Sequence, residues 1–140
     1  MATPRANVIL GLTREEVRNR LPSIIEFSEL GDAVEAPVRT FSSGMMARLG
    51  FSIAVHVDAD ILIVDEVLAV GDYAFEQKCY ARIEEFRAAG GSILFVSHNM
   101  AAVRRVADRC AWLKEGKIAQ SGALEEVIAA YESDPSAPRL

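Results

Sequence analysis

Long apolar runs are missing from this 140-residue sequence, and so are clustered cysteines. No apolar stretch approaches the roughly 20 residues that a membrane-spanning helix needs. The two cysteines, Cys79 and Cys110, lie far apart and show no CxxC spacing. We therefore expect buried thiols in a reducing compartment rather than a zinc site.

An excess of positive charge is missing too, because 20 acidic residues outnumber 15 lysines and arginines and the net charge is −5. A protein that coats nucleic acid needs a basic face, so this balance argues against nucleic acid as a partner. The nearest thing to a basic cluster is Arg104, Arg105 and Arg109, which we interpret as a solvated face. The 51% of hydrophobic residues is ordinary for a soluble domain with one core.

The first part of the chain has helical patterns. Thr13 and Glu16 have the spacing of a capping box, and apolar residues at helical spacing follow them. Pro22 is expected to kink this helix or to split it into two. A second helix is predicted to begin near Ser42 or Ser43, since serine often caps a helix.

The second part alternates strand and helix patterns. Two short apolar runs, ILIVDE at 61–66 and SILFVSH at 92–98, predict buried strands, with a helix capped by Asp72 between them. This order gives a parallel βαβ unit with a right-handed crossover. A helix, a strand pair that turns at Glu115 and Gly116, and a last helix are predicted to follow.

The fold class is therefore α/β. We expect residues 1–57 to form a helical segment that ends with the second helix. Residues 58–131 are expected to form the parallel βαβ core and a C-terminal strand pair with its helix. The polar, proline-containing residues 132–140 are expected to form a disordered tail.

Polar side chains end both predicted parallel strands. Asp65 and Glu66 end the first strand, and His98 ends the second. Ligands of open parallel sheets bind beyond the carboxyl ends of the strands. A magnesium–phosphate ligand is one explanation, since Mg²⁺ takes one or two carboxylates and a second carboxylate can polarise water. The alternative is a pair of solvated acids that cap the next helix.

The turn FSSGM, residues 41–45, places two hydroxyl groups and a glycine at the start of the second helix. A helix N-terminus offers N–H groups and a partial positive charge, and glycine lets a phosphate approach closely. The alternative is that Ser42 or Ser43 serves only as a helix cap.

These motifs together resemble the nucleotide-binding domain of ATP-binding cassette (ABC) transporters. The family's signature, Walker B, D-loop and H-loop motifs match, in order, FSSGM, ILIVDE, AVGD at 69–72 and SHN around His98. The variant forms SSGM and VDEVLAVGD are similar to the branch that exports O-antigen, capsule and teichoic-acid polysaccharides. The resemblance covers residues 7–131, and it implies a partial P-loop NTPase fold.

The resemblance implies roles at the strand ends. Asp65 would organise Mg²⁺, and Glu66 would act as the general base or orient the attacking water. His98 would contact the γ-phosphate of ATP and the catalytic water.

It also implies a second group of residues that act between subunits. Ser42 and Gly44 would contact the γ-phosphate of an ATP held by another subunit, with Ser43 and Met45 beside them. Asp72 would reach across the interface of a head-to-tail dimer. The helical segment would face transmembrane permease subunits, so the implied location is cytoplasmic, on the inner face of the membrane.

The 140 residues lack the family's phosphate loop G-x-x-x-x-G-K-[ST], which holds the β- and γ-phosphates. No aromatic adenine platform and no Q-loop glutamine precede the helical segment either. We therefore expect the C-terminal part of such a domain, from a truncated gene product, a mis-called start or a split domain. The isolated chain is expected neither to bind ATP tightly nor to hydrolyse it. It could instead be a non-catalytic module that lends its signature motif to an intact ATPase. A soluble ABC ATPase of DNA repair or translation is a third, weaker hypothesis.

Overall fold

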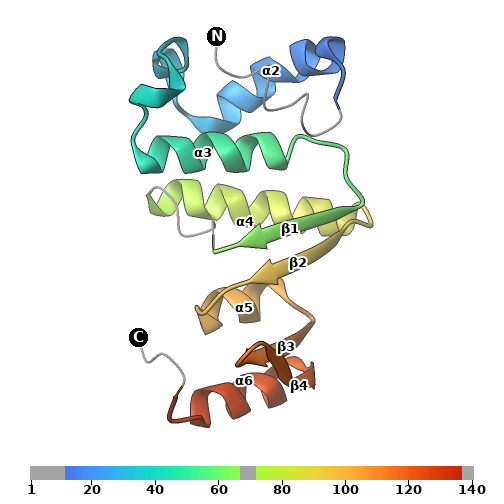
Figure 1. The fold of residues 1–140 in the computed structure, drawn as a ribbon. Helices are drawn as coiled ribbons and strands as arrows, with labels where there is room; N and C mark the ends of the chain where they lie inside the picture. Colours follow the sequence, from blue (N-terminus) through green and yellow to red (C-terminus); the bar gives the residue numbers. More distant parts are fainter. Residues whose placement is uncertain (1–11, 67–71, 137–140) are drawn as a thin grey trace. The chain divides into compact units, whose positions relative to one another are not determined.

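The computed structural model describes residues 12–66 and 72–136 (Figure 1). The chain divides into two compact units at Leu94 and Phe95. In chain order the elements are α2 (Arg14–Ser28), η1 (Gly31–Glu35), η2 (Val38–Thr40), α3 (Ser43–Ala54), β1 (Ile61–Asp65), α4 (Tyr73–Ala88), β2 (Ser92–Val96), α5 (Met100–Val106), β3 (Arg109–Lys114), β4 (Lys117–Ala123) and α6 (Leu124–Ser133). None of the described helices is long and apolar enough to cross a membrane.

Helix α2 begins with the predicted capping box. Thr13 accepts a hydrogen bond from the backbone N–H of Glu16, whose carboxylate accepts one from the backbone N–H of Thr13. The expected split at Pro22 is wrong, because Pro22 lies inside one continuous helix. Val17 and Ile24, on either side of the proline, are almost fully buried. Their packing outweighs the backbone hydrogen bond that proline cannot make.

The core of the first unit lies where α2 and α3 meet. Ile24, Leu49 and Ile53 form a buried cluster, and an aromatic group extends it towards α4. The rings of Phe27 and Phe75 meet edge to face with their centroids 5.9 Å apart. Because aromatic pairs of this geometry add to the burial energy, α2 is fastened to the start of α4.

His56 and Cys79 also belong to this packing. Nδ1 of His56 lies 2.7 Å from the carbonyl oxygen of Ser52, and the imidazole ring meets Phe27 edge to face. Cys79 is buried, and this burial raises the pKa of its thiol to about 12. Cys79 is therefore the buried thiol that the sequence predicts, and Cys110 is half-buried.

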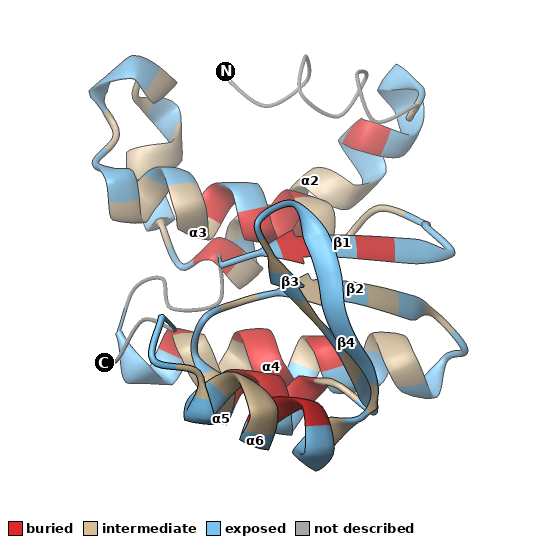
Figure 2. Ribbon diagram, turned by 60° about the horizontal axis from the view of Figure 1, so that its bottom comes forward, coloured by how far each residue is buried: buried red, intermediate tan, exposed pale blue. Residues whose placement is uncertain are grey.

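Strands β1 and β2 pair in a two-stranded parallel sheet (Figure 1). The sequence predicts strands buried on both faces, but β1 alternates between exposed and buried residues (Figure 2). Leu62 and Val64 are buried, whereas Ile61 and Ile63 are 63% and 68% exposed. The apolar run therefore gives the strand correctly, while one of its faces lies open in this chain.

The second unit carries the antiparallel hairpin of β3 and β4, which turns at Glu115 and Gly116 as predicted. Both turn residues have positive φ angles, 51° and 73°, as two-residue hairpin turns require. Helix α6 contacts both strands. It continues through Glu132 and Ser133, which the sequence assigns to the tail.

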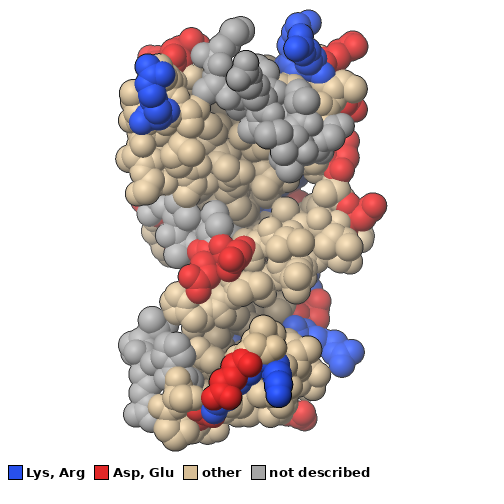
Figure 3. Space-filling model, in the orientation of Figure 1, with Lys and Arg blue, Asp and Glu red and all other residues tan. Residues whose placement is uncertain are grey.

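Arg104 ties α5 to α6 in this unit. Its guanidinium forms ion pairs with Glu125 and Glu132 at 3.2 and 3.3 Å. The sequence predicts a solvated face at the arginines that follow residue 98. At Arg104 this face is a surface ion-pair network. In Figure 3 acidic side chains, drawn in red, lie beside several of the blue lysine and arginine side chains.

Candidate functional site

The turn Ser42–Met45, called the signature turn below, is the first turn of α3 with its cap. Ser42 has extended backbone angles, and its hydroxyl oxygen accepts a hydrogen bond of 3.2 Å from the backbone N–H of Met45. Ser42 and Ser43 are exposed. The structure thus brings the four predicted signature residues together at a helix N-terminus, whose partial positive charge suits a phosphate.

Gly44 has no steric reason to be glycine in this chain. An added Cβ would have Ser42 Oγ as its nearest neighbour, at 3.9 Å, which is ordinary contact. The backbone of Gly44 lies in a helix, where alanine is more favourable than glycine by about 0.5–1 kcal/mol. The missing side chain therefore leaves room for something outside the described chain.

Asp65 and Glu66 follow the buried part of β1 and are both exposed. Asp65 is the last residue of the strand, and Glu66 has a φ of 52°. A left-handed backbone is uncommon for a residue other than glycine and is found often at functional sites. Two exposed carboxylates in sequence are donors that fit Mg²⁺, which prefers carboxylate oxygens together with water and phosphate oxygens.

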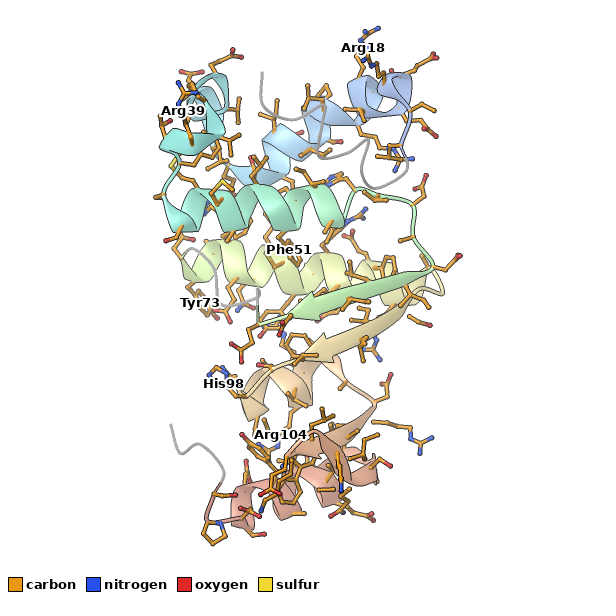
Figure 4. All side chains as sticks on the ribbon, in the orientation of Figure 1. Arg18, Arg39, Phe51, Tyr73, His98 and Arg104 are labelled. Atoms are coloured by element: carbon orange, nitrogen blue, oxygen red, sulfur yellow. The ribbon has the colours of Figure 1, made fainter. Side chains whose placement is uncertain are left out.

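A hollow of about 480 Å³ opens between α3 and β1 and includes both Ser43 and Asp65 in its wall. The rest of its wall is apolar or glycine: Met46, Ala47, Gly50, Phe51, Ala54, Leu62, Ile63 and Val64. Figure 4 labels Phe51 on α3. Because none of the described residues in this wall is a lysine or arginine, the chemistry of the described wall suits an apolar side chain and does not suit a triphosphate.

Asp72 is the N-cap of α4, as the sequence predicts. Its Oδ1 accepts a hydrogen bond of 3.0 Å from the backbone N–H of Phe75, and its Oδ2 accepts one of 3.0 Å from Arg48. The bond from Phe75, with a smaller contribution from Arg48, lowers the pKa of the Asp72 carboxyl. Asp72 is therefore ionised and engages its own chain through both oxygens. The rest of the AVGD motif, residues 69–71, lies outside the described residues.

His98 follows β2 and belongs to the second unit (Figure 4). That His98 lies close to Asp65 and Glu66 therefore stays a prediction. Two neighbours of His98 fix the local backbone: Ser97 Oγ accepts from the N–H of Asn99, and Asn99 Oδ1 accepts from the N–H of Ala101 at 3.0 Å. Sequence reasoning missed Asn99 as the cap of α5, although asparagine before MAAV is the usual signal.

Sequence reasoning also missed Arg48, which contacts Glu29, Asp72 and the ring of Phe75. The only signal in the sequence is a single arginine within the apolar stretch MMARLGF. These partners are distant in the sequence, so no local pattern could have predicted them.

Curated proteins with similar sequences share one kind of name. The chain is 51% identical over 124 residues to the O-antigen export system ATP-binding protein RfbB of Klebsiella pneumoniae, covering 89% of this chain and 50% of that protein. It is 50% identical over 124 residues to the teichoic acids export ATP-binding protein TagH of Staphylococcus epidermidis, covering 89% and 47%. The chain thus spans about half the length of the curated relatives it matches. No protein-family model matches it.

Solved structures agree on the fold. An ATP-binding subunit of an ABC transporter superposes with a TM-score of 0.74 at 24% identity, over 91% of this chain and 53% of that one. The ATP-binding cassette MJ0796, in a dimeric post-hydrolysis state bound to ADP and phosphate, gives a TM-score of 0.67 at 20% identity, over 81% and 49%. This chain is therefore homologous to the ATP-binding proteins of O-antigen and teichoic-acid export systems over about half their length, and it has the corresponding part of the ABC ATP-binding fold.

Proposed function

We propose that this chain is part of the ATP-driven machinery of an ABC exporter for a polysaccharide. The observation that carries this proposal is the identity of about 50% to proteins named for O-antigen and teichoic-acid export. In this proposal the chain works against transmembrane permease subunits at the cytoplasmic face of the membrane. It pairs head to tail with a second ABC ATPase domain, and ATP lies between the two.

The strand-end residues carry the chemistry in this proposal. Asp65 holds Mg²⁺, Glu66 orients or deprotonates the attacking water, and His98 contacts the γ-phosphate. Mg²⁺, when bound, neutralises negative charge on the phosphate oxygens. The exposed carboxylates at the end of β1 support the first two roles.

The chain by itself is not expected to hydrolyse ATP. Its 140 residues contain no G-x-x-x-x-G-K-[ST] loop, which is the main source of triphosphate binding in this class of fold. Among the residues that the structure describes, the wall of the hollow beside Asp65 offers no lysine or arginine to replace that loop.

A second candidate function is that of a module that lends its signature turn to an intact partner ATPase. The observation in its favour is that Ser42–Met45 forms a helix start capped by the Ser42 hydroxyl, with Ser42 and Ser43 exposed. The turn can therefore meet a phosphate that another subunit holds.

A measurement of ATP hydrolysis by the purified chain tests the prediction that the chain alone does not hydrolyse ATP. With Mg²⁺ and ATP, we expect phosphate release no faster than that from the Glu66→Gln variant. Activity that is well above this control, and that Glu66→Gln abolishes, would overturn the prediction that the chain alone is inactive.

Association tests the proposed role itself. The chain is mixed with RfbB of Klebsiella pneumoniae, in a variant that binds ATP without hydrolysing it. We expect a complex in analytical ultracentrifugation that forms with ATP and not with ADP. The same chain carrying Gly44→Trp should fail to form it. A complex indifferent to nucleotide, or no complex at all, contradicts the proposed pairing.

A further inference from the structure

Arg48 connects α3 to two other segments of the first unit. It lies one helical turn after Gly44 on α3, and its side chain is only 16% exposed. One guanidinium nitrogen pairs with Glu29 at 3.2 Å and another pairs with Asp72 at 3.0 Å. The guanidinium carbon lies 4.4 Å from the centre of the Phe75 ring. Such a forked, stacked geometry is one that arginine provides and lysine does not.

Glu29 extends these contacts to the end of α2. It caps that helix with a left-handed backbone, at a φ of 56°. Its carboxylate also accepts a hydrogen bond of 2.9 Å from Lys78 of α4, whose ammonium donates to the carbonyl oxygen of Phe27 at 3.1 Å. Lys78, Glu29, Arg48 and Asp72 thus alternate in charge, and we call these four residues the charge network. The network joins the C-terminal end of α2 to the middle of α3 and to the first turns of α4.

We propose that Arg48 is a positioning residue, which holds the signature turn and Asp72 in a fixed relation to the end of α2. The meaning of this inference rests on the head-to-tail pairing proposed above, in which the family resemblance has the signature turn contact a partner's ATP and Asp72 reach across the interface. A displacement of the C-terminal end of α2 then reaches both groups through Glu29 and Arg48. The signature turn and Asp72, which belong to separate motifs, therefore move together.

The network also defines what happens when the Asp72 side chain gives up a contact within its own chain in order to reach a partner subunit. Its Oδ2 must first release Arg48, since its Oδ1 is held by the backbone N–H of Phe75. Arg48 then keeps Glu29 as its counter-charge, so that the half-buried guanidinium is never left without a carboxylate. Glu29 therefore allows Arg48 to release Asp72 without losing its last carboxylate partner.

Carboxyl and amide resonances of the isolated chain test the link without nucleotide or partner. In an NMR pH titration, the midpoint of Asp72 should lie below the ordinary value and should rise in Arg48→Gln. It stays below the ordinary value there, because the bond from Phe75 remains. In the unaltered chain the amides of Gly44 and Met45 should shift with the same midpoint as Asp72. In Arg48→Gln this shared titration should be lost.

Arg82→Gln is the matched control. Arg82 also bridges two segments, from α4 to the carbonyl oxygen of Val55, but it does not belong to the charge network. The Arg82→Gln variant should leave the midpoint of Asp72 and the shared titration unchanged.

Arg48→Lys keeps the charge without the forked guanidinium, so it should hold the midpoint of Asp72 low while weakening the shared titration. If Arg48→Gln does not fold, Arg48→Lys supplies the decisive reading.

An Asp72 midpoint that is the same in Arg48→Gln and Arg82→Gln would overturn the proposal. So would a shared titration of the signature turn that survives the loss of the fork. Because this experiment contains no ATP and no second ATPase, its result is independent of the association assay. The two proposals can therefore fail separately.

Discussion

At the scale of single residues, Gly44 is a position where the fold does not require glycine. The structure tolerates a methyl group there, with the nearest atom at 3.9 Å. Whatever requires glycine at this place must approach from outside the described chain, and in our proposal that is the γ-phosphate of a partner's ATP.

We therefore predict that Gly44→Ala keeps or raises the stability of the chain, by up to about 1 kcal/mol, because alanine is the better helix former. Urea denaturation followed by circular dichroism measures this. The same variant should bind the ATP-loaded partner more weakly. Gly50→Ala, on the same helix with open space around its Cβ, is the matched control and should keep partner binding. A large loss of stability in Gly44→Ala alone would show that the glycine serves the fold.

At the scale of elements, local sequence signals predicted most helices and strands. Capping residues gave the starts of α2, α3 and α4, and Glu115–Gly116 gave the hairpin turn. Such signals act between neighbours in the chain, so they are visible in the sequence. Of the two outcomes expected at Pro22, the split is wrong, because tertiary packing decides whether a helix continues through a proline.

The candidate site was predictable to the same extent. Ser42–Met45 and Asp65 lie at the element ends where the sequence places them. What the sequence could not give is the link between these ends, because Arg48 meets Glu29 and Asp72 across 19 and 24 residues of sequence. Long-range ion pairs leave no periodic trace in a single sequence.

The ion pair between Lys114 and Asp134 holds the end of α6 to β3 and makes this element sensitive to acid. Lys114 donates to Asp134 at 2.6 Å, and the backbone N–H of Ser136 donates to the same carboxylate at 2.7 Å. The Lys114 ammonium, followed by Ser136, lowers the pKa of Asp134 to about 2. Because this value is below the unfolded one of about 3.9, the stabilisation is complete above pH 4 and is lost between about pH 4 and pH 2.

We predict that Lys114→Gln raises the titration midpoint of Asp134 and reduces the loss of stability over that pH range. NMR titration of the Asp134 carboxyl and urea midpoints at pH 6 and pH 2.5 measure the two effects. Lys117→Gln is the control, since Lys117 is the cross-strand neighbour of Lys114 on β4. Equal effects of both substitutions would mean that general charge, and not this pair, sets the titration.

At the scale of the whole molecule, the open face of the parallel sheet decides how the chain behaves in solution. Ile61, Ile63 and Leu94 are 56–68% exposed on β1 and β2 (Figure 2). Parallel sheets are normally covered on both faces, and exposed apolar strands promote pairing between chains. The chain is therefore expected to associate with itself when no other polypeptide covers this face.

We predict that Ile63→Lys shifts the purified chain towards monomer, because each buried isoleucine contributes roughly 1.5–3 kcal/mol to such an association. Sedimentation velocity over a range of concentrations measures the shift. Ile118→Lys is the control, since Ile118 is 65% exposed but lies on β4. An unaltered chain that stays monomeric at all concentrations would contradict the prediction.

The backbone of Glu66 has a consequence for how this sequence can change. At a φ of 52°, glycine is the residue of lowest conformational energy, and every other side chain carries some strain. Substitution of Glu66 by glycine would therefore relieve backbone strain at this position. In the proposed function the strain is kept because the carboxylate acts on the water that attacks ATP.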